Sequence, residues 1–369
     1  MEFKLKACLE KIIDNRGKNP IYFKKEKYPV IDNVCIKNNY YINEKDVNRY
    51  INEDTYINFL RGYVEKDMPI MTLVGSGIGK VALIKNKNAA IVQNTIGFKT
   101  NDRLNSKYLY YWFLTKQKEL QLFNRGSGQP SIKKTDVEEM LLDIPCIDIQ
   151  NKIVNILSKI DDKIELNNQT NDNLLELIKK LYIEKIKNNN DINFEEKNLD
   201  EFCNIFTGKK NANASEENGQ YKFFTCAPEP LSINSYIYDG PAVIVAGNGA
   251  YTGRTNFYNG KFDLYQRTYG ITTNNDYIYL FYAMIYTDLQ NDIMGGTHGS
   301  AIPYIVMNDI AKFKVKYNKE LFDELSQKIK VLLLKIKSNE AQNETLEQLR
   351  DTLLPKLMNG EIDLDKIEI

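Results

Sequence analysis

Two long segments of the chain share one heptad pattern, and this duplication limits the possible folds more than any other feature. The core positions of the first segment are Ile153, Leu157, Ile160, Ile164, Asn167, Asn171, Leu174, Ile178, Leu181 and Lys185. Those of the second, each 172 residues later, are Leu325, Ile329, Leu332, Ile336, Asn339, Asn343, Leu346, Arg350, Leu353 and Leu357. Alternating spacings of four and three residues are typical of a left-handed coiled-coil interface. The sequence therefore predicts two long helices that pack through equivalent stripes.

An asparagine pair interrupts the apolar stripe at the same depth in both segments. The residues are Asn167, Asn171, Asn339 and Asn343. Buried asparagine lowers the stability of a helical interface and is tolerated where it fixes the register. The four asparagines meet in an antiparallel pair, but they also meet in a parallel one. We favour the antiparallel pair because a compact segment lies between the two helices in the chain. A helix that only completes a core, or one that forms a homodimer, would explain one such segment. It explains less well why the asparagine pair recurs at the same depth in both segments.

The duplication continues upstream of each helix. The matched segments are 75–84 with 245–258, 106–114 with 275–284, and 126–137 with 299–310. The first match is glycine-rich and strand-like, with two extra residues in its second copy. Gln93 and Gly97 match Gln266 and Gly270 at a shift of 173 residues. The second match is aromatic with helical spacing, and the third is a turn that contains glycine and proline. Repeats on this scale indicate pseudo-two-fold symmetry.

These matches predict an α+β chain with two mixed, β-rich modules in a pseudo-two-fold repeat, separated by two long helices. The expected boundaries are 1–149 for the first β module, 150–192 for the first helix and linker, 193–318 for the second β module and 319–369 for the second helix. The linker 187–198 is rich in asparagine and charge and suits a solvated hinge.

The charge is unevenly distributed, although the chain as a whole has a formal net charge of zero. Residues 1–149 carry 24 basic and 18 acidic side chains, and residues 193–318 carry 10 and 13. A neutral total argues against a non-specific nucleic-acid binder. An acidic second module would need a local basic patch, or a partner, in order to bind a polyanion.

The composition also argues against a metal site and against secretion. The five cysteines form no CxxC pair and the chain has one histidine, so we expect no structural metal. Scattered thiols suit a reducing cytoplasm better than a disulfide framework. No long apolar run is present, so we expect neither a signal peptide nor a membrane helix.

The sequence does not indicate an enzyme. The segment VGSGIGKVA resembles a phosphate-binding loop, but that motif requires glycine at Val74 and Ser or Thr at Val81. A tight turn between two strands explains its glycines. The Asn-Pro-Pro-aromatic motif of methyltransferases is absent from the sequence. A Ser/His/Asp triad could use His298 alone, which lies beside a predicted turn.

Taken in order, the motifs resemble the specificity subunits of type I restriction–modification enzymes. The resemblance includes the GSxGK-type turn, the run GSGQPSI at 126–132 and the helix that begins QNKIVNILSKIDDKIELNN. The second helix, ending LEQLRDTLLPKLMNGEIDL, is typical of the C-terminal conserved region of that family. The likeness covers essentially the whole chain, although the first module lacks the tryptophan-containing opening strand of many relatives and the second glycine-rich turn is expanded.

The resemblance implies a non-catalytic protein that recognises a bipartite DNA target. Each β module would be a target recognition domain for one half-site. The helices would dock two DNA adenine methyltransferase subunits, and a restriction subunit can join that complex. This chain would need no cofactor of its own, because the methyltransferase subunits bind the S-adenosylmethionine.

Several side chains beside the glycine-rich turns have the chemistry that DNA recognition requires. Arg or Lys can bind guanine and Asn or Gln adenine in the major groove, while Lys, Arg and hydroxyl groups bind phosphates. The candidates in the first module are Ser76, Lys80, Gln93, Asn94, Ser127, Gln129, Ser131, Lys133 and Lys134. Those in the second are Asn248, Tyr251, Arg254, Gln266, Arg267, Thr297 and His298. Taken alone, each of these candidates could also be an ordinary exposed residue of a turn, with no role in binding. Arg254 and Arg267 are the strongest candidates because the second module has no other arginine.

Aromatic runs at 108–113 and 277–282 could stack on bases. Their helical spacing favours a place in the core instead. Two rival functions also remain open. The chain could be a repeat scaffold that binds protein partners without recognising DNA, or a recognition subunit derived from a single-chain restriction enzyme that lost its catalytic half.

Overall fold

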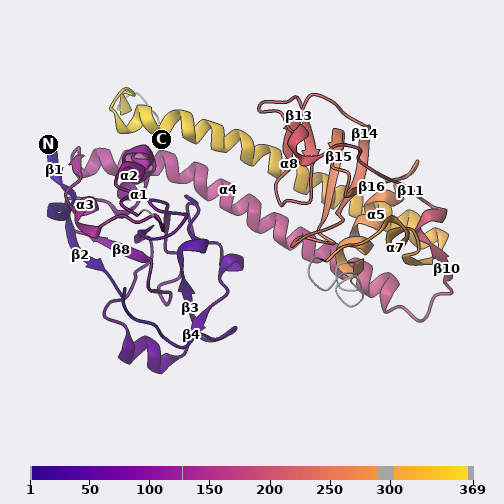
Figure 1. The fold of residues 1–369 in the computed structure, drawn as a ribbon, viewed down its shortest axis with the longest axis horizontal. Coiled ribbons are helices and arrows are strands. Elements are labelled where there is room, and N and C mark those ends of the chain that lie inside the picture. The colour runs from indigo at the N-terminus through magenta and orange to yellow at the C-terminus, as the bar shows by residue number, and fades with distance from the viewer. Residues whose placement is uncertain (1, 127, 290–302, 365–369) are drawn as a thin grey trace. The chain divides into compact units, whose positions relative to one another are not determined.

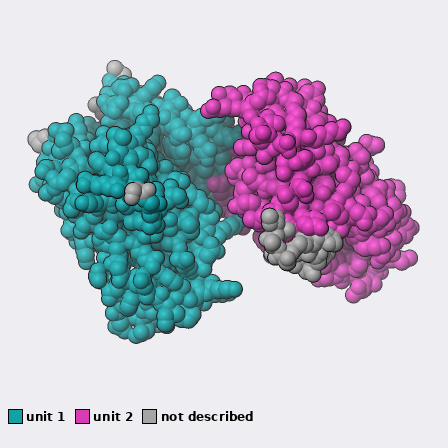
Figure 2. Space-filling view, in the orientation of Figure 1, with its two compact units in different colours: residues 1–165, 343–369 teal, residues 166–342 magenta. Residues whose placement is uncertain are grey.

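The computed structural model describes residues 2–126, 128–289 and 303–364, which form two compact units (Figures 1 and 2). Unit 1 comprises residues 1–165 and 343–369, and unit 2 comprises residues 166–342. The boundary between them falls within two long helices, α4 (Ile147–Tyr182) and α8 (Lys319–Met358). Each unit therefore contains one β-rich module and a part of both helices, which confirms the predicted α+β class and the repeat.

Unit 1 is built on a four-stranded antiparallel sheet in the order β2-β8-β5-β6. Its strands are β2 (Leu9–Ile13), β5 (Pro69–Thr72), β6 (Val81–Leu83) and β8 (Thr95–Thr100). Every residue of β5 and β6 is buried, so both faces of the sheet are covered at these two strands. Smaller sheets are formed by β1 (Glu2–Lys4) with β9 (Leu141–Asp143), and by β4 (Tyr50–Ile51), β3 (Tyr28–Ile31) and β7 (Ala90–Ile91).

Aromatic residues on α1 (Ser106–Thr115) fill the core of unit 1. The helix begins at Asn105, whose side chain accepts hydrogen bonds from the backbone N–H groups of Lys107 and Tyr108. The six residues from Tyr108 to Phe113 are all buried. This confirms that the aromatic run belongs to the core. The short helices α2 (Gln117–Leu122) and α3 (Lys134–Glu138) follow before α4.

Unit 2 contains a six-stranded sheet in the order β11-β16-β14-β15-β12-β13. The strands are β11 (Asn204–Thr207), β12 (Tyr221–Phe224), β13 (Leu231–Ile233), β14 (Tyr238–Ala246), β15 (Thr255–Leu264) and β16 (Thr268–Thr272). The aromatic helix α5 (Tyr277–Met284) is buried from Ile278 onward, again as predicted. Short α7 (Met307–Ala311) precedes β17 (Lys314–Tyr317), which pairs with β10 (Glu195–Asn198) in a two-stranded sheet.

The two sheets share one frame of four strands. The order β2-β8-β5-β6 of unit 1 recurs as β11-β16-β14-β15 in unit 2, with antiparallel pairing throughout. The segments between the first two frame strands in the chain differ. Residues 14–68, here called insert 1, contribute to the separate β3 sheet, whereas residues 208–237, insert 2, add β12 and β13 to the main sheet. The modules therefore combine a common frame with unlike inserts.

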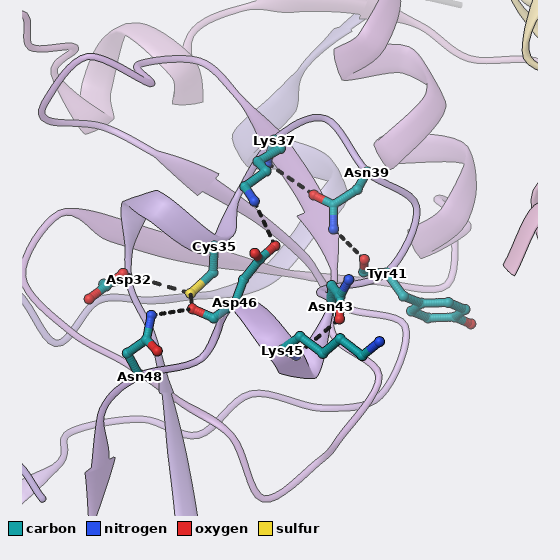
Figure 3. Close-up of polar contacts among 9 residues, drawn as sticks. All are labelled: Asp32, Cys35, Lys37, Asn39, Tyr41, Asn43, Lys45, Asp46 and Asn48. Carbon is teal, nitrogen blue, oxygen red and sulfur yellow. Dashed lines mark hydrogen bonds and ion pairs between the residues drawn. The ribbon is translucent and has the colours of Figure 1, made fainter. Parts of the chain in front are cut away.

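Polar contacts between residues close in the sequence stabilise residues 32–48 of insert 1 (Figure 3). The Cys35 thiol donates to the backbone carbonyl of Asp46 at 3.3 Å, and the Lys37 ammonium lies 2.8 Å from the Asp46 carboxylate. The Asn43 side chain accepts from the Lys45 N–H at 3.0 Å. Most of this segment pairs with no β-strand, so these bonds define its shape.

The two long helices are antiparallel within each unit. In unit 1, Ile153 and Leu157 of α4 share a core with Leu354 and Leu357 of α8. In unit 2, Ile178 of α4 shares a core with residues 325–336 of α8. Low residue numbers on α4 meet high numbers on α8, and the reverse holds in the other unit, which confirms the antiparallel arrangement.

The buried stripe departs from the strict heptad pattern toward the outer ends of the helices. Tyr182 and Ile186 are buried beyond Ile178, whereas Leu181 is half-buried and Lys185 is exposed. A helix that packs on a broad globular core buries residues at spacings of three and four over a wider face than a coiled coil does. The heptad pattern therefore describes the middle of the helices better than the parts that cover the modules.

The asparagines lie in the interface between the helices, as the pattern predicts. All four are at most 8% exposed. Asn339 donates its side-chain N–H to Asn171 Oδ1 at 2.7 Å, and Asn167 donates to Gln342 Oε1 at 2.8 Å. A role in fixing the register remains a prediction.

Replacing Asn171 and Asn339 together by leucine should raise the melting temperature. Each buried leucine contributes about 1.5–3 kcal/mol, while one neutral hydrogen bond contributes about 0.5–1.5 kcal/mol net. Asn171→Leu alone should destabilise, because it leaves the Asn339 amide buried without this partner. Thermal unfolding of the two variants tests this. Equal melting temperatures for the single and double variants would show that the two amides are not partners.

Candidate nucleic-acid interface

Three loops meet at one end of the four-stranded sheet of unit 1. The glycine-rich turn 73–80 joins β5 to β6, and a second loop at 92–94 precedes β8. The third loop, which includes residues 124–126 and 128–131, precedes α3. Backbone hydrogen bonds join them: Leu73 N–H donates to Asn94 at 2.7 Å, Gly75 N–H to Pro130 at 2.9 Å, and Ile132 N–H to Leu73 at 2.8 Å. We call this arrangement loop cluster 1.

Unit 2 repeats the same arrangement with different residues. The N–H of Gly247 donates to Arg267 at 2.8 Å, that of Gly249 to Pro303 at 3.0 Å, and that of Ile305 to Gly247 at 2.9 Å. We call this loop cluster 2. It joins the turn 247–254, the loop 265–267 and the segment that begins at 303. The two clusters therefore match in their backbone hydrogen bonds.

The two glycine-rich turns have equal lengths, so the predicted two-residue expansion of the second turn is wrong. Thr72 N–H donates to Lys80 in one turn and Ala246 N–H to Arg254 in the other, and each pair encloses seven residues (73–79 and 247–253). Sequence similarity alone aligns the two strands with a gap that the backbone hydrogen bonds do not contain. The corrected shift of 174 residues makes Lys80 equivalent to Arg254.

Glycines permit the shape of each turn. Gly75 and Gly79 have φ values of +109° and +75°, and Gly249 and Gly253 have +83° and +81°. Only glycine adopts this region without strain. A Cβ on Gly79 would also lie 3.0 Å from the Cβ of Leu120. Each turn leads into a strand, β6 or β15, and not into the helix that a phosphate-binding loop requires.

The structure brings most of the predicted DNA-binding residues together in the two clusters. Exposed candidates are Ser76, Gln129, Lys133, Tyr251, Gln266 and Arg267. Half-buried candidates are Lys80, Gln93, Asn94, Ser131, Lys134, Asn248 and Arg254. Ser127, Thr297 and His298 lie outside the described residues.

Each cluster has basic side chains in or beside its loops. Lys80, Lys133, Arg254 and Arg267 form no ion pair with any described residue. By contrast, Lys134 lies 4.0 Å from the Glu138 carboxylate. Positive charge without an internal partner is available to a polyanion. Two of these four cations, Arg254 and Arg267, belong to loop cluster 2 of the second module, which carries 10 basic and 13 acidic side chains.

The first residues of both inserts also lie at the clusters, although the sequence does not predict this. The Gln93 side chain donates to Asn19 Oδ1 at 2.7 Å, and the Gln266 N–H donates to the carbonyl of Lys210 at 2.9 Å. Each insert therefore begins against the glutamine of its own cluster. Basic residues within five positions of the ends of β2 and β11, such as Lys18 and Lys209, are a signal that could have indicated this.

Neither a metal centre nor a membrane segment is found in the described part of the chain. No group of three or more His, Cys, Asp or Glu side chains there is arranged to hold a metal ion. None of the helices described is both long and apolar enough to cross a membrane.

Comparison with known proteins gives one family. The model of the type I restriction modification DNA specificity domain matches residues 3–176 and again residues 191–348. The two matches together cover most of the chain, one for each half of the repeat.

Two curated relatives carry corresponding names. The chain is 37% identical over 172 residues to the type I restriction enzyme EcoDI specificity subunit of Escherichia coli, a match that spans 44% of this chain and 37% of that protein. It is 27% identical over 336 residues to the type I restriction enzyme MjaIX specificity subunit of Methanocaldococcus jannaschii, spanning 79% of this chain and 76% of the relative.

The fold also resembles a solved structure. The crystal structure of a type I restriction-modification system S subunit from M. genitalium superimposes with a TM-score of 0.60 at 17% sequence identity. The superposition covers 97% of this chain and 95% of that one. At this identity the likeness supports the fold, while the sequence matches support the family.

Proposed function

Because the chain belongs to the type I restriction–modification specificity-subunit family, we propose that it recognises a bipartite DNA target, with each loop cluster binding one half-site. The observation that carries the proposal is the loop cluster itself, which is built twice with the same backbone hydrogen bonds and with unpaired cations each time. Specificity subunits are non-catalytic, so the chain supplies recognition to a larger complex. We assign residues 1–149 and 193–318 to the target recognition domains.

The helical segments, 150–192 and 319–369, are the proposed docking sites for methyltransferase subunits. The pseudo-two-fold repeat offers two equivalent surfaces, which suits two copies of one partner. Those subunits would bind S-adenosylmethionine and methylate adenine in the target, and a restriction subunit can join the complex. This chain would need no cofactor.

Methylation mapping tests the function directly. The chain is co-expressed with its methyltransferase in a host that lacks other adenine methylation, and the genome is sequenced for methylated adenine. A split motif with a fixed spacer, present only when this chain is expressed, is the expected result. Co-purification with a methyltransferase but no split motif would contradict the proposal, and a chain that binds neither DNA nor methyltransferase would favour a protein-binding scaffold.

The affinity of the complex for its target should fall steeply with salt. Each neutralised phosphate contributes a slope of about −0.9 to the plot of log K against log salt concentration. Four phosphate contacts would lower the affinity about a hundredfold between 50 and 200 mM salt. Fluorescence anisotropy with a labelled duplex measures the slope. A flat response would exclude phosphate contacts.

A further inference from the structure

Asn94 and Arg267 occupy the same place in the two loop clusters, yet they differ in the base that their side chains can recognise. Resting on the proposed function, we propose that this pair determines a base at the corresponding position of each half-site, with Asn94 selecting adenine and Arg267 selecting guanine. The two half-sites then differ at this position because the residues differ.

The equivalence rests on three shared features. Each residue lies between a glutamine and a threonine, in the runs Gln-Asn-Thr at 93–95 and Gln-Arg-Thr at 266–268. In both clusters the carbonyl of this residue accepts a hydrogen bond from the backbone N–H of the residue that directly follows β5 or β14, at 2.7 Å from Leu73 and 2.8 Å from Gly247. In both, the threonine that follows is buried and begins a frame strand, β8 or β16.

Both side chains are available to a ligand. Arg267 is exposed and Asn94 is half-buried, and neither side chain forms a hydrogen bond or ion pair with another described residue. The neighbouring Gln93 differs, because its amide N–H already donates to Asn19 at 2.7 Å. In loop cluster 1, therefore, Asn94 is better placed than Gln93 to use both its donor and its acceptor on a base.

The chemistry of the two side chains fixes the expected bases. An asparagine amide pairs in bidentate fashion with N6 and N7 of adenine, and an arginine guanidinium with O6 and N7 of guanine. A second equivalent pair, Lys80 and Arg254, is cationic in both clusters, so it offers the same preference to both half-sites. We therefore expect the preferred base to differ between the half-sites where residues 94 and 267 bind, and not where residues 80 and 254 bind.

Exchanging the residues tests the proposal. The complexes of the wild type, Asn94→Arg and Arg267→Asn, each co-expressed with the methyltransferase, are used to select bound duplexes from a randomised library. For Asn94→Arg we expect one adenine in one half-site to be replaced by guanine, with roughly 5- to 150-fold discrimination. Arg267→Asn should make the reverse change at the corresponding position of the other half-site. Asn88→Arg is the matched control, since it adds the same charge to an exposed loop at the other end of β6.

Each outcome has one meaning. A split motif that is unchanged in both variants would overturn the proposal, as would a uniform loss of affinity across all sequences, which indicates a phosphate contact. A change of base in the Asn88→Arg control would also overturn it. Absence of any split motif from the wild-type complex would contradict the proposed function itself.

Discussion

Replacing Arg350 by methionine should lower the free energy of unfolding of unit 1 by about 3–5 kcal/mol, because it leaves a buried charge without its partner. Arg350 of α8 donates to Asp161 of α4 at 2.8 Å, and Asp161 is 2% exposed. The Tyr111 hydroxyl donates to the other oxygen of Asp161 at 2.6 Å. Burial raises the pKa of Tyr111 well above its usual value, so the hydroxyl stays a donor.

The loss should depend on pH in a defined direction. Burial raises the pKa of Asp161, and the hydrogen bonds from Tyr111 and Arg350 oppose this rise. Without Arg350 the pKa rises further. A carboxyl whose pKa is higher in the folded state binds its proton more tightly there. The variant should therefore lose stability as the pH increases above the pKa that the Asp161 carboxyl has in the unfolded chain.

Trp112, the single tryptophan of the chain, lies beside Tyr111 in the core of unit 1. Urea unfolding followed by its fluorescence therefore measures this unit. Equal stability of wild type and Arg350→Met by this probe would contradict the prediction.

A compensated variant separates the loss of a partner from the loss of the ion pair. The equivalent positions in unit 2, at the shift of 172, are Leu333 for Asp161 and Ile178 for Arg350, and both are buried. The triple variant Asp161→Leu, Arg350→Ile, Tyr111→Phe should therefore unfold near or above the wild-type urea midpoint, because an apolar set can replace a buried ion pair without loss.

Inserting one heptad into both long helices should lengthen the spacer of the DNA target by about three base pairs. The insertions follow residues 169 and 341, between the asparagines of each pair. Seven residues add about 10.5 Å to each helix, and one base pair rises about 3.4 Å. Binding should weaken, because three base pairs also rotate one half-site by about a quarter turn or more.

Methylation mapping measures the new spacer, and both half-site sequences should be unchanged. The control variant inserts the heptad into α4 alone, which places the two helices out of register and should abolish methylation. Full activity of the double insertion at the original spacer would show that these helices do not determine it.

The helices could be predicted from the sequence because their information is periodic and duplicated. Asn171 and Asn339 meet as the pattern required. The Asp161–Arg350 pair could not be predicted, since Arg350 occupies a heptad core position whose partner lies outside the pattern. A buried charge is explained only by the side chains that surround it.

The loop clusters show a similar limit. The sequence indicated the glycine-rich turns and most of the polar candidates near them. It aligned the two turns with a false gap, because similarity between short strands is weak, and only the backbone hydrogen bonds identified Lys80 with Arg254. The contact between Gln93 and Asn19 was not predicted either, because it joins residues 74 positions apart.

The division of unit 1 into two stretches of chain has a consequence for synthesis on the ribosome. Its core includes Leu354 and Leu357, which are translated after all of unit 2. At about 5–20 residues per second, residues 166–342 take about 10 to 35 s to translate. Throughout that time the apolar side of the nascent α4, including Ile153 and Leu157, lacks its partner helix. The unit that is translated first is therefore completed last, and its nascent form is the one we expect chaperones to bind.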